Sequence, residues 1–324
     1  MTNKVGAILN LLWRKSMLQT PKPTKARRSN KKINRMTNTF ENSIIIKSNK
    51  QSYTVLSSVN NYLTQEHFID VNSLGLERGI NEYTKKDTAP LPSTEDREGY
   101  YESRHYDFWL SGLEEYQKIK RESAEAGLNI DNHLKVLDFG CASGRVLRHF
   151  LYQSNADIWG CDINEDHVTW CNKFLSGRSR IFQNTSLPHL QVEDNFFDIV
   201  YCLSVFTHIE TFETSWLCEI RRILKPGGIA YITIHDETSW KNMPDWGVRR
   251  AIVNHPEFNP IWLETGFPNE KFVSRWAEDK SYTSNVFYKL SYIKNIWSRF
   301  FSIVKVIPMG SSYQTVLILK KMAE

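Results

Sequence analysis

The chain has 324 residues, of which 41% are hydrophobic. This composition excludes disorder of the whole chain and a collagen-like or coiled-coil fold, and the length suits one large domain or two small ones. The net charge of +5 is unevenly spread: residues 1–40 hold ten basic and no acidic side chains, and residues 41–324 carry −5. The charge therefore does not by itself indicate a nucleic-acid-binding body.

Residues 1–40 are predicted to be a basic, disordered arm, because this segment has too few apolar side chains to fold alone. Apolar residues at helical spacing predict one short amphipathic helix over 5–18. Contact with an anionic membrane through 5–18, contact with RNA and organelle targeting all stay open as roles for the arm. No run reaches the ~20 apolar residues of a membrane-spanning helix, so no transmembrane segment is expected.

Residues 41–95 are predicted to be an N-terminal extension, with strands at 44–46 and 53–59. Pro90 and Pro92 predict a linker or turn before a domain that covers residues 96–324. That domain begins with a predicted helix over 106–126, closed by Gly127. After this helix, the sequence predicts strands alternating with helices. Strands are expected at 134–139, 156–162, 179–183, 197–203 and 228–234, and helices at 145–153, 165–175 and 211–224.

Short apolar runs separated by helical patterns predict an α/β fold with a parallel sheet covered on both faces. Two further extended runs, 300–307 and 313–321, flank a predicted turn at 308–311 and indicate an antiparallel pair. The five cysteines are odd in number and lack Cys-x-x-Cys spacing, which favours reduced thiols in the cytoplasm over disulfides or a metal site.

The most informative segment is VLDFGCASGR, residues 136–145, where a strand ends in Asp138 and a small-residue turn leads into a helix. Ligands of open parallel sheets bind at the carboxyl ends of strands, and Gly140 and Gly144 allow close backbone approach. A dinucleotide fingerprint would need glycines where Ala142 and Arg145 stand.

Two carboxylates limit the classes of ligand that this strand edge could bind. Asp138 would repel a pyrophosphate and suits a cofactor with a cationic end, and Asp162, at the end of the next strand, is placed to accept hydrogen bonds from ribose hydroxyls. S-adenosylmethionine has an ammonium group and a ribose, and it has no phosphate.

Four blocks in order resemble the class I S-adenosylmethionine-dependent methyltransferases, from about Gly99 to Lys321. They are VLDFGCASGR, GCDI (160–163), FFDIVYCLSVFTHI (196–209) and LKPGGIAYITIH (224–235). The usual pattern has a middle glycine where this chain has Ala142. The resemblance implies a Rossmann-like doubly wound sheet of seven strands with the last antiparallel, in agreement with the terminal pair.

The resemblance also implies the cofactor-binding residues. The methionine end would lie against Asp138 and the turn residues Gly140, Cys141, Ala142 and Gly144. Asp162 would bind the ribose, Ile163 would pack on the adenine, and Asn184 would face its amino group. Leu203 and Ser204 would lie near the methyl group.

Two histidines are candidate catalytic bases. His208 follows the fourth strand of the parallel series and His235 closes the fifth, so either could take a proton from a hydroxyl or amine. The alternative roles are a helix cap or a core position for His208 and a core position for His235. A methyltransferase needs little beyond in-line positioning, so a dedicated base need not exist.

An aromatic-rich insertion is expected between strands five and six, at about 236–290. Residues 240–301 hold 14 aromatic side chains, which form either a cover over the acceptor or a small satellite core. Trp240 and Trp246 would separate these two hypotheses by mutation.

The predicted function is methyl transfer to a hydroxyl, or an amine, of a small-molecule, sugar, glycan or natural-product acceptor. The preference for oxygen comes only from the SVFTH block, which resembles a bacterial subgroup that modifies glycans and secondary metabolites. An RNA methyltransferase using the arm and a non-catalytic binding module are the alternatives. The acidic body and the absence of a Pro-Cys dipeptide weigh against a nucleic-acid substrate.

Overall fold

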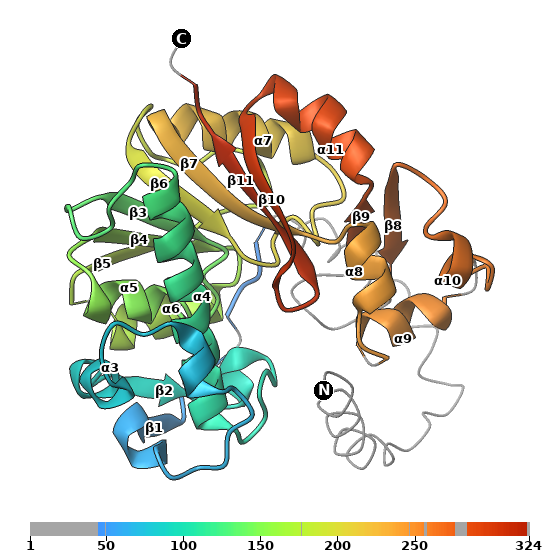
Figure 1. The fold of residues 1–324 in the computed structure, drawn as a ribbon. Helices are drawn as coiled ribbons and strands as arrows, with labels where there is room; N and C mark the ends of the chain where they lie inside the picture. Colours follow the sequence, from blue (N-terminus) through green and yellow to red (C-terminus); the bar gives the residue numbers. More distant parts are fainter. Residues whose placement is uncertain are drawn as a thin grey trace.

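The computed structural model describes residues 45–48, 50–175, 177–245, 247–255, 258–275 and 284–322. The basic arm, its predicted helix over 5–18 and Trp246 lie outside these residues. The fold places a central sheet between helices, with the N-terminal extension (blue to cyan) and the insertion (orange) in different parts of the molecule (Figure 1).

The seven-stranded sheet has the order β10-β11-β7-β6-β3-β4-β5. Its strands are β3 (Lys135–Phe139), β4 (Asp157–Asp162), β5 (Ser179–Gln183), β6 (Phe197–Cys202), β7 (Leu224–Ile234), β10 (Ser302–Ser311) and β11 (Gln314–Lys320). Pairing is parallel from β5 to β7, and β11 runs antiparallel to both of its neighbours. The predicted Rossmann-like sheet with an antiparallel last strand is therefore confirmed.

Alternate side chains along each strand point to opposite faces of the sheet and pack in two separate hydrophobic cores. Val136 and Ile158 face the core formed with α4 (His105–Glu125), α5 (Leu147–Gln153) and α6 (Glu165–Phe174). Leu137 and Cys161 face the core formed with α7 (Glu213–Ile223) and α11 (Leu290–Ile296). This arrangement is a doubly wound sheet, and it brings the ends of β3 and β4 side by side.

The extension is fastened to the sheet domain by a fully buried ion pair. Arg148 of α5 donates to both carboxylate oxygens of Asp87, at 2.6 and 2.9 Å, and the Trp109 indole donates to the same carboxylate at 2.7 Å. Neither charged side chain is exposed to solvent. Breaking such a pair leaves an unpaired buried charge, so this contact ties the extension energetically to the domain.

In the structure, the segment that precedes α4 continues past residue 95 to residue 104, and the extension is taken to include it and the loop around Glu98. The extension contains α3 (Ile80–Lys86), short 3₁₀ turns and the two-stranded sheet of β1 (Val55–Ser58) and β2 (Pro90–Pro92). The predicted linker at Pro90 and Pro92 is wrong, because both prolines lie in β2. A two-stranded sheet leaves one edge of each strand unpaired, which accommodates the missing N–H groups. Of the predicted strand at 44–46, Ile46 forms an isolated bridge to Asn164.

The terminal hairpin turns later than predicted. β10 continues through 308–311 with a register irregularity, and the turn is made by Ser312 and Tyr313. Met309 and Ser312 both have left-handed backbone, with φ of 53° and 54°. The predicted turn at 308–311 is therefore a bulged continuation of the strand. In β7, which pairs with β11, residues 225–228 lie inside the strand, and Gly227 has a φ of 81°.

The insertion separates β7 from β10, as predicted. It contains α8 (Glu237–Asn242), α9 (Val248–Val253), α10 (Trp262–Thr265) and the antiparallel pair β8 (Lys271–Arg275) and β9 (Ser284–Tyr288). Its described aromatic residues pack mainly on one another in a small core of Trp240, Phe267, Phe287 and neighbours. This packing supports the satellite-core hypothesis for these residues.

Within the described residues, no helix combines the length and apolar character that crossing a membrane requires.

Candidate functional site

The glycines of the turn after β3 are required by internal packing. Gly140 and Gly144 have φ of 84° and 77°. A Cβ on Gly140 would lie 2.4 Å from Val205 Cγ2, and one on Gly144 would lie 2.4 Å from Leu175 Cδ1. Both positions therefore exclude larger residues through contacts within the protein, in addition to their backbone conformation.

Ala142 takes the left-handed conformation usually given to glycine, with a φ of 45°. Its N–H donates to Asp162 Oδ2 at 2.8 Å, and its carbonyl accepts from the Cys171 thiol at 3.3 Å. Cys141, the preceding residue, is buried. These contacts fix the turn against the end of β4.

Asp138 is a buried carboxyl group next to a phenol. Tyr201 donates its hydroxyl to Asp138 Oδ2 at 2.8 Å, and the backbone N–H of Leu147 at the start of α5 also donates to the carboxyl. Burial raises the pKa of Asp138 to about 7, although these bonds and Arg145 act in the opposite direction. A cation placed beside this group would stabilise its ionised form.

Asp162 ends β4 and is held by two backbone donors. Oδ1 accepts from the N–H of Asn164 and Oδ2 from the N–H of Ala142, both at 2.8 Å. A carboxylate has about four acceptor positions, so two remain. The side chain is 11% exposed, which leaves it within reach of a ligand at the end of the strand.

The predicted adenine-side residues lie on the adjoining loops. The Ile163 carbonyl accepts from the Ile46 N–H at 3.0 Å, so a segment of the extension runs beside it. Asn184 follows β5, and its side-chain amide donates to the Thr185 carbonyl at 2.9 Å. Both residues are partly exposed.

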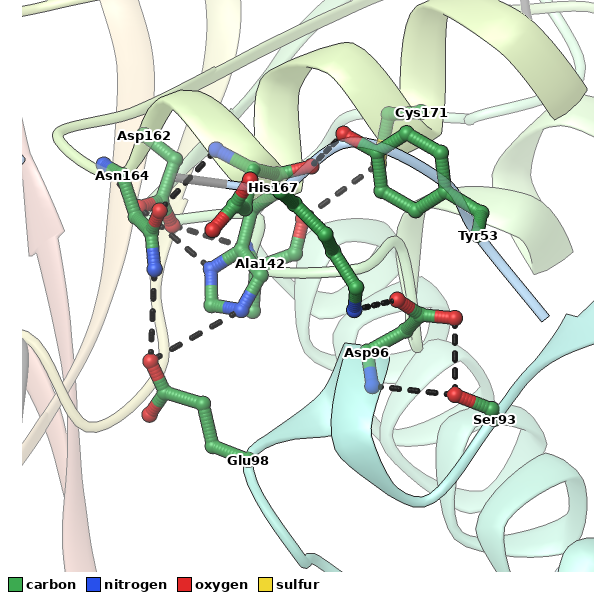
Figure 2. Close-up of polar contacts among 11 residues, drawn as sticks. Tyr53, Ser93, Asp96, Glu98, Ala142, Asp162, Asn164, His167 and Cys171 are labelled. Atoms are coloured by element: carbon green, nitrogen blue, oxygen red, sulfur yellow. Dashed lines mark hydrogen bonds and ion pairs between the residues drawn. The ribbon is translucent and has the colours of Figure 1, made fainter. Parts of the chain in front are cut away.

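Sequence reasoning missed two residues beside Asp162. His167 of α6 adjoins the Asp162 carboxylate, and Glu98 of the extension contacts His167 and Asn164 on the side away from Asp162 (Figure 2). His167 stands five residues after Asp162, a spacing that a helix starting at Asn164 turns back toward the strand end. Nothing local in the sequence points to Glu98, because its approach depends on the folding of the extension.

A second polar group lies at the ends of β6, β7 and β11. Ser204 follows β6 with a φ of 58°, and its N–H donates to Thr233 Oγ1 at 2.7 Å. Gln314 is 2.9 Å from Ser204 Oγ through Nε2, and that same nitrogen lies 3.4 Å from His235 Nε2. Leu203 is partly buried beside them. Gln314 and Thr233 were not predicted.

The two candidate bases have different surroundings. His208 Nδ1 lies 2.7 Å from the Ser284 carbonyl, which identifies Nδ1 as the protonated nitrogen and leaves Nε2 as the basic one. His235 is 1% exposed and stacks on Phe287 and Tyr313, with ring centroids 4.9 and 5.4 Å away. Burial lowers the pKa of His208 to about 4 and that of His235 to about 3.

Asp236, next to His235, has a structural position. Its carboxylate caps α8 by accepting from the Ser239 N–H at 2.9 Å, and it accepts from the Thr315 hydroxyl at 2.7 Å.

A separate polar cavity of about 330 Å³ lies between the extension and α4, lined by Arg78, Lys120 and neighbours. None of its lining residues belongs to the predicted site.

Residues 137–232 match the family described as "Methyltransferase domain". A sterol 24-C-methyltransferase of Schizosaccharomyces pombe is 28% identical over 137 residues, which cover 40% of this chain and 36% of that enzyme. A cycloartenol-C-24-methyltransferase of Oryza sativa is 30% identical over 135 residues, covering 40% and 39%. The chain thus spans well under half of the length of these relatives.

Solved structures with a similar fold include S-adenosylmethionine-dependent methyltransferases of Methanosarcina mazei and Clostridium acetobutylicum. The first has a TM-score of 0.46 and 16% identity and covers 62% of this chain and 97% of that chain. The second has a TM-score of 0.47 and 16% identity and covers 67% and 92%. From the sheet order, the four sequence blocks and the family match, residues 137–232 belong to the class I S-adenosylmethionine-dependent methyltransferases.

Proposed function

We propose that this chain transfers a methyl group from S-adenosylmethionine to a hydroxyl, or an amine, of a small-molecule, sugar or natural-product acceptor. The observation that carries the proposal is the pair of carboxylates, Asp138 and Asp162, at the adjoining ends of β3 and β4 within the segment that matches the family. The four buried free thiols support a reducing, cytoplasmic setting.

The residues present fit the cofactor. Asp138 is a carboxyl whose burial favours a neighbouring cation, which suits the ammonium group. Asp162 keeps two acceptor positions beyond its backbone donors, which suits two ribose hydroxyls. When bound, S-adenosylmethionine supplies a methyl group on a positively charged sulfur. Ile163 and Asn184 would adjoin the adenine, and Gly140, Cys141, Ala142 and Gly144 would support the methionine end.

The acceptor would lie at the ends of β6 and β7, near Leu203 and Ser204. Of the two histidines, we assign the base role to His208. Its Nδ1 is held by the Ser284 carbonyl, so its lone pair is at Nε2, and its low pKa keeps it neutral near pH 7. Such an imidazole accepts the hydrogen bond of an acceptor hydroxyl and takes its proton as the new bond forms. His235 is enclosed between two aromatic rings, which favours a structural role.

A carbon acceptor is the second candidate, because the matching relatives are named sterol and cycloartenol C-24-methyltransferases. RNA methylation through residues 1–40 is a third hypothesis, and peripheral membrane contact through 5–18 would serve a lipid acceptor. The net charge of −5 over residues 41–324 favours an uncharged small molecule over RNA.

Labelled methyl transfer tests the proposal. The full chain is incubated with S-adenosylmethionine carrying a labelled methyl group and with panels of sugars, phenols, amines, sterols and RNA. Label in a hydroxyl or amine product, lost in Asp162→Asn and retained in Asp157→Asn, supports it. Label only in sterols or RNA, or no turnover with any panel, contradicts it. A fall in kcat of about 100-fold in His208→Gln would support the base assignment.

A further inference from the structure

His167 lies between two carboxylates that come from different parts of the chain (Figure 2). Its Nδ1 is 3.7 Å from Asp162 Oδ1 at the end of β4, and its Nε2 is 3.8 Å from Glu98 Oε1 in the extension. Glu98 Oε1 also accepts from the Asn164 side chain at 3.4 Å. His167 is therefore one link, beside Asn164, between Asp162 and the extension.

Glu98 is held in this position by its own loop. It has left-handed backbone, with a φ of 53°, and the N–H groups of Glu98 and Gly99 donate to the carbonyls of Glu95 and Thr94 at 3.2 and 2.8 Å. The Glu98 side chain remains 23% exposed. These bonds fix the backbone of Glu98, and the contacts with Asn164 and His167 place its carboxylate.

A second segment of the extension approaches the same strand end. The Ile46 N–H donates to the Ile163 carbonyl at 3.0 Å, and the Glu165 N–H donates to the Ile46 carbonyl at 2.9 Å. Ser48 N–H donates to Glu165 Oε2 at 2.8 Å, and its hydroxyl donates to Asp166. Residues 45–48 and the Glu98 loop therefore bring the extension to the end of β4 from two segments.

We propose that His167 and Glu98 are positioning residues of the ribose subsite, with protonated His167 holding the Asp162 carboxylate in the orientation that receives the ribose hydroxyls. The proposal rests on the proposed function, because it takes Asp162 as the ribose ligand. It makes the N-terminal extension a functional part of the cofactor site, beyond its role in packing.

The charges around His167 set the expected pH dependence. Burial lowers the pKa of His167, but the nearby carboxylate of Asp162 and the charges of Glu98 and Asp166 outweigh burial, so its pKa is raised. Asp162, Glu98 and Asp166 are the ionisable groups that act on it. The stabilising charge is therefore present at low pH and is lost as the pH rises through the raised pKa. Above that pKa, the carboxylates of Asp162 and Glu98 lose the cation between them.

The experiment is calorimetric titration of the full chain with S-adenosylhomocysteine between pH 5.5 and 9. The variants are His167→Gln and Glu98→Gln. The matched controls are His133→Gln and Glu95→Gln, which change exposed side chains before β3 and on the Glu98 loop. The ratio of the variant Kd to the wild-type Kd is compared at each pH, because other titrating groups then cancel.

We expect both variants to bind about tenfold more weakly than wild type at low pH, and the ratio to fall toward one as the pH rises through the pKa of His167. An analogue of S-adenosylhomocysteine that lacks both ribose hydroxyls should show no such loss. Melting temperatures establish that each variant is folded, and Glu98→Gln carries the test if His167→Gln does not fold.

The outcomes separate the two proposals. If wild type does not bind S-adenosylhomocysteine, the proposed function fails and this inference fails with it. If wild type binds and both variants match the controls at every pH, the inference alone is overturned. Equal losses for the ligand and its deoxy analogue would assign His167 and Glu98 a purely structural role and would also overturn it.

Discussion

The two ends of the proposed reaction site are built differently, although both lie where parallel strands end. At β3 and β4, Asp162 is held by the backbone N–H groups of Ala142 and Asn164 from the adjoining turns, and Asp138 accepts from the Tyr201 phenol on the neighbouring strand β6. At β6, β7 and β11, the polar network joins Ser204 to Gln314, which is 110 residues later in the chain. His208 likewise depends on Ser284, 76 residues later.

The two ends of the proposed site would bind different molecules, the cofactor at β3 and β4 and the acceptor at β6 and β7. The ammonium and ribose groups of the proposed cofactor would be bound by two carboxylates on neighbouring strands, Asp138 and Asp162, with Glu98 of the extension near the second. The proposed acceptor end combines Ser204 and His208, inside the matched residues 137–232, with Ser284 of the insertion and Gln314 of the terminal hairpin, outside them. Under the proposed function, we expect acceptor preference to depend on these two segments and cofactor binding to depend on β3, β4 and their turns.

The largest expected effect on cofactor affinity is that of replacing Asp162. Asp162→Asn retains one acceptor oxygen in place of a carboxylate, so the ribose and one of the two backbone donors lose their partner. We expect S-adenosylhomocysteine affinity to fall at least about 100-fold. Asp157→Asn, at the opposite end of the same strand, is the control. Calorimetry that gave the two variants equal affinities would place the ribose elsewhere.

Mutation of a buried aromatic residue in the insertion should lower stability and leave cofactor affinity nearly unchanged. Trp240 is 2% exposed, and its indole donates to the Trp262 carbonyl at 2.8 Å. Trp240→Ala should lower the free energy of unfolding by about 3–5 kcal/mol, with S-adenosylhomocysteine affinity changed less than twofold. Denaturant unfolding and calorimetry measure the two quantities. Unchanged stability together with a raised acceptor KM would show that the insertion is an acceptor cover instead.

The ionisation of Asp138 should affect how the stability of the protein depends on pH. Its raised pKa of about 7 means that the folded state holds this proton more tightly than the unfolded chain. Its contribution to stability is therefore largest at low pH and is lost between about pH 4 and 7. At pH 8, unliganded Asp138→Asn should be more stable than wild type by about 2 kcal/mol, yet bind the cofactor at least tenfold more weakly. Parallel pH profiles in the two proteins would contradict a buried, titrating Asp138.

The smallest effect concerns the backbone of Ala142. Its φ of 45° costs about 1 kcal/mol for a residue with a Cβ, and glycine removes this cost while increasing the entropy of the unfolded chain. Ala142→Gly should therefore stabilise the protein by about 0.5 kcal/mol. Ala126→Gly, at a φ of −80°, should destabilise it. Thermal melting of both variants checks the difference in sign.

The central sheet could be predicted because its strands are local apolar runs whose order follows from the family resemblance. Asp138 and Asp162 came from the same reasoning, since each ends a strand. The hairpin turn was misplaced because 308–311 has turn-like composition but pairs with β11 through a bulge. Glu98 could not be found, because its approach to His167 depends on the buried pair of Asp87 and Arg148 and on the packing of the extension.

Direct binding of S-adenosylhomocysteine to the full chain tests the central claim, that the ends of β3 and β4 form a cofactor site. Calorimetry should give one ligand per chain, and ligand at about 100 times the Kd should raise the melting temperature by about 5 °C. The absence of both binding heat and a melting shift in folded wild-type protein would contradict the claim.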